Sequence, residues 1–202
     1  MPGGTRLLVD ERVAGEFTGR FTGRAAALRQ GDPRDEATDV GPNITSAHLE
    51  RVDGFVRRAV AAGARPLLGG TPNHDLGGLY YRPTLLAGAK PGSEILTEEV
   101  FGPVLTLQTF RGEDEAVALA NSTRYGLAAT VFTGDHHRAE RVSARLVAGT
   151  VWVNCFFVRD LRAPFGGAGL SGIGREGGTW SFDFYGDVKN TVFAPEGWRS
   201  DG

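Results

Sequence analysis

The sequence contains little sulfur: of its 202 residues, one is a cysteine (Cys155) and one a methionine (Met1). A single cysteine forms no disulfide within the chain and excludes zinc sites that are built from paired cysteines. No stretch approaches the roughly 20 apolar residues of a membrane span. The first residues also lack the apolar core and cleavage site of a signal peptide. We therefore expect a protein of the reducing cytoplasm that has no membrane partner.

The sequence also lacks an excess of charge of either sign. Lys and Arg total 22, Asp and Glu total 24, and the formal net charge is −2. Nucleic-acid binding usually shows as a clustered basic excess, so we expect no nucleic acid as a partner. The four histidines show no metal-ligand spacing, and we expect no metal site and surface positions for His48, His74, His136 and His137.

Apolar residues and glycine are plentiful. Hydrophobic residues make up 41% of the chain, which is enough for a core and too many for a disordered protein. The 30 glycines follow no fixed period, so they predict tight turns and not collagen. No internal repeat and no linker between domains is visible.

Apolar periodicity predicts strands that alternate with helices, which is typical of an α/β fold. The fold expected is a largely parallel sheet flanked by helices, with Ser46 and Asp135 as helix N-caps. We expect strands at 6–9, 64–70, 104–110, 127–133, 149–158 and 187–194, and helices at 12–28, 46–62, 113–120 and 135–146. Residues 195–202 are expected to form a flexible tail.

A Gly-rich segment contains a formal G-x-G-x-x-G pattern at Gly167, Gly169 and Gly172. Phosphate binding by such a pattern needs a strand directly before it and a helix directly after it. Here six residues separate the expected end of the preceding strand from the Gly-rich run. The downstream acid, Asp187, begins the terminal strand and does not end a second strand of a dinucleotide-binding unit. A loop with unusual backbone angles or close backbone contacts is therefore favoured over a dinucleotide loop.

Three other features offer weaker chemistry. Cys155 lies within an apolar run, which favours a buried structural cysteine over a reactive one. The pair Glu98–Glu99 precedes an aromatic residue and Gly-Pro, which is an unusual way to enter a sheet, but the residues alone favour a solvated acidic turn. The arginines Arg159 and Arg162 could bind a substrate carboxylate or form a surface salt bridge with Asp160.

Taken together, several segments resemble the aldehyde dehydrogenase superfamily. They are RLLV, GDPRDEATDVGP, LLGG, YYRPTLL, LTEEVFGPVLTL, NSTRYGLAATVFT, AGTVWVNC, APFGGAGLSGIGREGG and DVKNTVF. They occur in the family's order and cover about Arg6 to Val192. The loop FFVRDLRAPFGG looks like the subgroup that oxidises semialdehydes of the hydroxymuconate type in aromatic catabolism.

The resemblance implies a site that is present only in part. Glu99 matches a glutamate that hydrogen-bonds the nicotinamide ribose, and Phe101 matches an aromatic residue near the nicotinamide. The positions that match the wall of the aldehyde pocket are Asn154, Phe157, Arg159 and Phe165. Met1 falls on the catalytic cysteine, and a thioether cannot form the thiolate that attacks an aldehyde.

The resemblance also implies how this chain differs from the intact enzymes. Residues 1–186 match the catalytic domain, whereas the general base and the domain that binds NAD or NADP are missing. We therefore expect the chain alone to be inactive and to bind no cofactor tightly. Residues 187–194 match a strand that joins subunits, so we expect a homo-oligomer. The alternatives are a non-catalytic oligomerising or regulatory fragment and a misassigned gene start.

Overall fold

A four-stranded sheet forms the centre of the molecule. The computed structural model describes residues 5–199, and the strand order is β1-β4-β3-β2. The strands β1 (Arg6–Asp10), β4 (Val104–Phe110) and β3 (Thr84–Ala87) run parallel. The edge strand β2 (Arg65–Leu68) is antiparallel to β3. The prediction of an α/β fold is confirmed, and the sheet is mixed.

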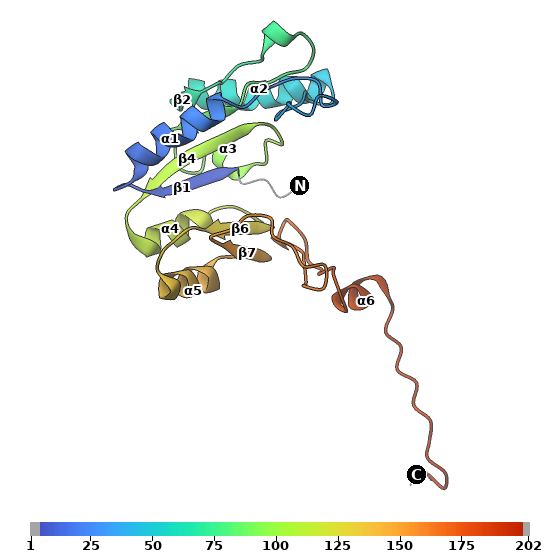
Figure 1. Cartoon of the computed structure of the whole chain (residues 1–202). Coiled ribbons are helices and arrows are strands. Elements are labelled where there is room, and N and C mark those ends of the chain that lie inside the picture. Colours follow the sequence, from blue (N-terminus) through green and yellow to red (C-terminus); the bar gives the residue numbers. More distant parts are fainter. Residues whose placement is uncertain (1–4, 200–202) are drawn as a thin grey trace.

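Helices cover both faces of this sheet (Figure 1). Leu85 and Leu86 are fully buried neighbours on β3, and their side chains enter the cores on opposite faces. Leu85 packs with residues of β1 and β4 beneath α1 (Ala14–Ala26). Leu86 packs with α2 (Ser46–Ala61) and the short α3 (Glu94–Thr97). The result is a three-layer arrangement with one apolar core on each side.

The start of α2 differs by one residue from the prediction. Ser46 was expected to be the N-cap, but the N-cap is Thr45, whose side chain accepts a hydrogen bond of 3.1 Å from the backbone N–H of His48. Both residues carry the hydroxyl that this role needs. Thr45 takes it because its backbone is extended whereas Ser46 is already helical.

A second group of elements follows the central sheet. The strands β6 (Ala128–Val131) and β7 (Thr150–Val153) form a parallel pair, separate from the four-stranded sheet. A short antiparallel pair joins β5 (Tyr125–Gly126) to β8 (Ala168–Gly169). The helices α4 (Gly112–Ala120) and α5 (His136–Arg145) lie beside the β6–β7 pair (Figure 1). Asp135 caps α5 as predicted, with its side chain accepting from the Arg138 N–H at 3.1 Å.

The strand expected at 149–158 is shorter than predicted. β7 ends at Val153 because Asn154 has a φ of 53°, and Phe157 has a φ of 58°. A non-glycine residue in the left-handed region cannot continue a strand. The chain therefore turns away from the sheet at Asn154.

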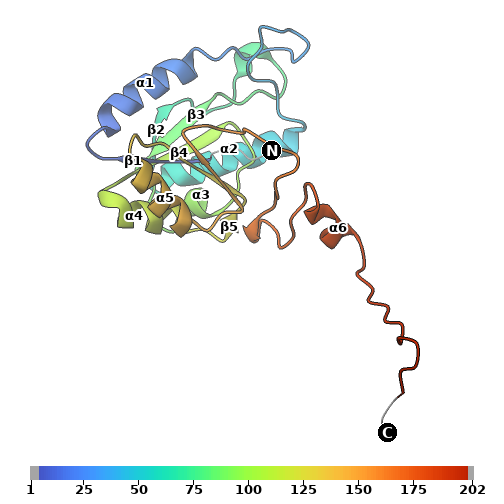
Figure 2. The ribbon, with the colours of Figure 1, turned by 60° about the horizontal axis from the view of Figure 1, so that its bottom comes forward.

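The C-terminal part departs most from the prediction. A helix that was not expected, α6 (Trp180–Tyr185), follows the Gly-rich segment. The expected strand at 187–194 is not formed: these residues are exposed and have no ladder partner among the described residues. Figure 2 shows the segment leading away from the rest of the molecule. A strand needs a neighbour to take up its backbone hydrogen bonds, and none lies beside it here.

The remaining helical element is short. A single turn of 3-10 helix, η1 (His74–Leu76), lies in the loop before β3. No helix within residues 5–199 has both the length and the apolar character needed to cross a membrane.

Candidate functional site

The loop of residues 98–102 lies between α3 and the start of β4 and is held by α2. The Arg51 guanidinium donates to the carbonyl oxygens of Val100 at 2.7 Å and Glu99 at 2.8 Å. His48 Nε2 lies 2.7 Å from the carbonyl oxygen of Phe101. A carbonyl only accepts, so this ring nitrogen carries the proton and donates. His48 was expected to be a surface residue, and Arg51 was not among the predicted site residues. The two residues are three positions apart, which places them on one face of a helix. This spacing was the sequence signal that could have indicated a shared role.

The same loop turns two predicted site residues outward. Phe101 has a φ of 56°, and 64% of its surface is exposed. Glu99 is also exposed, and no group within residues 5–199 hydrogen-bonds its carboxylate. The residues on either side are anchored: Val100 is buried in the core, and a Cβ on Gly102 would lie 2.7 Å from a methyl group of Val52. The loop thus presents a carboxylate and an aromatic ring on a fixed backbone.

Glu98 has a different environment from Glu99. Its carboxylate accepts from Arg124 at 2.9 Å and from the Tyr125 hydroxyl at 3.3 Å. Burial and the negative charge of Glu98 raise the pKa of Tyr125. The two adjacent acids therefore do not act as a pair, since one forms a salt bridge and the other faces solvent.

The exposed Asn154 side chain links the end of β7 to the segment after β6. Its side-chain amide donates to the carbonyl of Thr133 at 2.8 Å and accepts from the Thr133 N–H at 2.9 Å. These bonds tie the end of β7 to the chain just after β6. Phe157 is 43% exposed and lies beside Trp152, with 6.1 Å between the ring centroids. Trp152 in turn donates to the Val158 carbonyl at 2.8 Å, which fixes this aromatic loop.

The two arginines of the following loop have separate partners. Arg162 forms the salt bridge with Asp160, at 2.7 Å, and lowers the pKa of that carboxyl. Arg159 lies over the ring of Phe165, 4.3 Å from its centroid, and its distance to Glu176 is 4.0 Å. In this structure Arg162 therefore pairs with Asp160, whereas Arg159 stacks on Phe165 and lies farther from its nearest acid, Glu176.

The Gly-rich segment does not form a phosphate-binding loop. β7 ends at Val153 and α6 begins at Trp180, so neither element flanks the Gly167–Gly172 pattern. Close backbone contacts explain the glycines instead. A Cβ on Gly149 would overlap the carbonyl of Gly166, and one on Gly167 would overlap that of Ser171. The interpretation of this segment as a close-contact loop agrees with the structure.

The two sulfur-bearing residues of the chain are Cys155 and Met1. Cys155 is a free thiol and half-buried, not fully buried as the apolar run indicated. Met1, the residue expected at the nucleophile position, lies outside the described residues. Within residues 5–199, no three His, Cys, Asp or Glu side chains gather where they could hold a metal ion.

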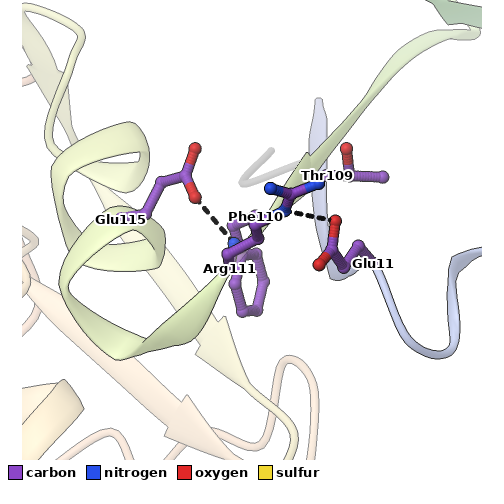
Figure 3. Close-up of a pocket in the computed structure, with 5 residues that line it drawn as sticks. All are labelled: Glu11, Thr109, Phe110, Arg111 and Glu115. Carbon is purple, nitrogen blue, oxygen red and sulfur yellow. Dashed lines mark hydrogen bonds and ion pairs between the residues drawn. The ribbon is translucent and has the colours of Figure 1, made fainter.

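A shallow hollow of about 240 Å³ lies at the other end of β4 from the 98–102 loop. Figure 3 shows its lining residues Glu11, Thr109, Phe110, Arg111 and Glu115. The Arg111 side chain donates to Glu11 at 2.6 Å, and its backbone N–H donates to Glu115 at 2.7 Å. Arg111 and both glutamates are therefore already paired with one another, and we do not treat this hollow as the candidate site.

The predicted site residues thus fall into two groups. Glu99 and Phe101 share one loop, and the remaining four lie between the end of β7 and β8. Arg124 connects the two regions, because its side chain donates to Glu98 and its carbonyl accepts from the Leu170 N–H at 2.9 Å. No direct hydrogen bond joins the two groups.

Comparison with known proteins gives one consistent result. Residues 3–191 match the model of the aldehyde dehydrogenase family. The chain is 44% identical over 192 residues to a 2-hydroxymuconic semialdehyde dehydrogenase from Pseudomonas sp. strain CF600, covering 93% of this chain and 40% of that protein. It is 41% identical over 194 residues to a 2-aminomuconic semialdehyde dehydrogenase from Danio rerio, with the same coverage.

A solved structure agrees. Betaine aldehyde dehydrogenase from Staphylococcus aureus in complex with NAD+ superposes with a TM-score of 0.86 at 38% identity, covering 90% of this chain and 37% of that one. The chain spans about 40% of the length of these relatives. The resemblance to muconic-type semialdehyde dehydrogenases is confirmed, and the chain belongs to the aldehyde dehydrogenase family.

Proposed function

We propose that residues 1–186 form the catalytic part of an aldehyde dehydrogenase that oxidises a carboxylate-bearing semialdehyde with NAD or NADP. The observation that carries this proposal is the 98–102 loop, which directs the Glu99 carboxylate and the Phe101 ring outward on an anchored backbone. A carboxylate accepts hydrogen bonds from ribose hydroxyls, and an aromatic ring packs against a nicotinamide ring. When bound there, the nicotinamide supplies the acceptor for hydride.

These residues fit only the nicotinamide end of the cofactor. Dinucleotide affinity comes largely from a glycine turn and helix N-terminus at the pyrophosphate, and the Gly167–Gly172 segment has neither neighbour. We therefore expect the 202-residue polypeptide to bind NAD+ weakly. We also expect it to show no turnover by itself, because the residue that matches the family's nucleophile is Met1, whose thioether cannot form a thiolate.

The positive charge of Arg159 supports a preference for a carboxylate-bearing substrate. Arg159 follows the exposed Phe157 by two residues and lies over the ring of Phe165, so a cation and an aromatic ring lie together. A guanidinium attracts a carboxylate and repels the quaternary ammonium of betaine aldehyde. The relatives named above include enzymes for both kinds of aldehyde. Arg159 favours the semialdehyde, and Asn154 shapes the pocket by fixing the start of this loop.

The segment 187–194 is proposed to pair with a strand of another subunit. Its exposed residues include Val188, Val192 and Phe193, which are 80–87% exposed. An extended, apolar segment with open backbone groups is suited to strand addition. The named relatives are dehydrogenases, which favours an enzyme subunit over a purely regulatory fragment.

The substrate proposal is tested in a protein that also contains the part of the relatives that this chain does not span. The chain is joined to the N-terminal part of the Pseudomonas relative, and kcat/KM is measured for 2-hydroxymuconic semialdehyde and for betaine aldehyde. Arg159→Leu removes a charge-assisted contact of about 1.5–3 kcal/mol, so the preference for the semialdehyde should fall by about tenfold to a hundredfold. Arg162→Leu is the matched control, because that guanidinium already binds Asp160. An unchanged preference in Arg159→Leu would contradict the role of Arg159.

A further inference from the structure

The contacts between α2 and the 98–102 loop reach the backbone of three successive residues. Arg51 spans the carbonyl oxygens of Glu99 and Val100, and His48 donates to that of Phe101. Consecutive carbonyls of an extended chain point in opposite directions. One helix face can meet all three only because the chain turns here, and the φ of 56° at Phe101 is part of that turn.

This turn costs conformational energy. A bulky residue in the left-handed region persists only where the surroundings over-determine its backbone. Here the surroundings are the two α2 side chains and the anchors on each side of Phe101, which are buried Val100 and Gly102 against Val52. The carbonyls are directed at the helix, so the side chains of Glu99 and Phe101 are left to point away from it.

We propose that His48 and Arg51 are positioning residues for the nicotinamide end of the cofactor site. They hold the loop so that the Glu99 carboxylate and the Phe101 ring are arranged before a nucleotide binds. Preorganisation of this kind raises affinity because less conformational entropy is lost on binding. The inference rests on the proposed function, since it assigns a purpose to the same loop, but the state of the loop can be measured without any nucleotide.

The alternative is that Arg51 merely fastens α2 to the neighbouring segment. The same helix carries a matched control for that role, Arg58. The guanidinium groups of Arg51 and Arg58 both lie over the Phe55 ring, at 4.9 and 5.1 Å from its centroid. Arg58, however, binds the Glu94 carboxylate at 2.8 and 2.9 Å and reaches no carbonyl of the loop.

Limited proteolysis of the 202-residue chain measures the loop directly. Chymotrypsin cuts after aromatic residues, and its rate follows the population of the open form when opening is fast. The rate of cleavage after Phe101 is divided by the rate after Phe182, which is 78% exposed on α6 and serves as the reference in every sample. Fragments are identified by mass, and circular dichroism checks that each variant is folded.

Four variants separate positioning from fastening. Arg51→Met should raise the Phe101/Phe182 ratio by roughly tenfold or more, because two charge-assisted bonds are lost. His48→Ala should raise it by about fivefold through the loss of one bond. His48→Gln keeps a donor and should restore the ratio, and Arg58→Met should leave it unchanged. An unchanged ratio in both Arg51→Met and His48→Ala would overturn the inference, as would an equal rise in Arg58→Met.

Ligand-observed NMR with NAD+ and with nicotinamide mononucleotide supplies the second readout. Saturation transfer to the nicotinamide protons is expected for the wild-type chain, and Arg51→Met should weaken it while Arg58→Met does not. No transfer in the wild-type chain, together with a well-protected loop, would contradict the proposed cofactor function and not the holding of the loop. Transfer that is equal in wild type and in a loop-opened Arg51→Met would overturn the positioning role itself.

Discussion

Two regions of the molecule, the residues up to Phe110 and the residues after Val153, are held together in different ways. They differ in the burial of their aromatic side chains, in the role of their glycines and in their hydrogen bonds. In the first region Phe55 is 6% exposed and the two leucines of β3 are fully buried between helices. In the second, Phe182 and Phe193 are 78% and 85% exposed. Between Val153 and Arg199, Gly167 alone is buried. The first region therefore has its own apolar core, and the second does not.

The second region is nevertheless ordered by another means. Its chain is held by backbone contacts, such as the reciprocal bonds between Phe165 and Glu176 at 2.7 and 2.8 Å. Glycines allow the close approach, as where the Phe184 ring lies on Gly174. Backbone bonds of this kind add little net free energy compared with apolar burial. The apolar core of the first region therefore holds the fold, whereas the second region leaves most of its aromatic side chains exposed.

The largest effect is expected in the core. Leu86→Ala removes a fully buried side chain from β3 and should lower the free energy of unfolding by about 2–5 kcal/mol. The matched control is Leu161→Ala, at a leucine that is 76% exposed, where the change should stay within about 0.5 kcal/mol. Urea denaturation followed by circular dichroism measures both. Equal losses would mean that the C-terminal region shares the core's stability.

A smaller, pH-dependent effect on Tm is expected from an ion-pair cluster between α4 and α5, which lie between the two regions in sequence. Glu113 binds Arg141 at 2.8 Å and Arg138 at 3.0 Å, and these two arginines lower its pKa. A carboxyl whose pKa is lower in the folded state stabilises the fold above its unfolded pKa of about 4.3. That stability is lost as the pH falls through the folded value. Glu113→Gln should therefore lower Tm slightly at pH 7.

The difference between the wild-type protein and Glu113→Gln should shrink as the pH falls below about 4.3. Differential scanning calorimetry at pH 7, 5 and 3.5 measures it. Glu36→Gln, at an exposed acid with no ion pair among the described residues, is the control and should give no pH-dependent difference. A constant Tm difference across this range would show that the hydrogen bonds and not the charge of Glu113 matter.

The smallest effect on unfolding is expected from removal of the chain after Gly186. These residues bury no core side chain, so the free energy of unfolding should change by less than about 0.5 kcal/mol. The oligomeric state should fall, because the proposed intersubunit strand is lost. Multi-angle light scattering compares the truncated and intact chains. An intact chain that remains monomeric at high micromolar concentration would contradict the assembly role of 187–194.

The local elements of this protein could be predicted from the sequence. The helical stripe of α2, the apolar run of β4 and the Asp135 cap of α5 depend on residues within a few positions of one another. Such features follow from backbone geometry and side-chain periodicity, which need no knowledge of distant contacts. Glu99 and Phe101 were picked out only by the resemblance of their motif to a known family, and their outward direction was not predicted.

Features that depend on distant neighbours could not be predicted from the sequence and are visible only in the tertiary structure. Arg51 and His48 meet the backbone of residues about 50 positions away, and no local pattern shows those carbonyls. The chain turns at Asn154, whose amide is bound to Thr133. The segment 187–194 has the residues of a strand, yet it forms none, because a strand is completed by a partner's hydrogen bonds and not by its own sequence.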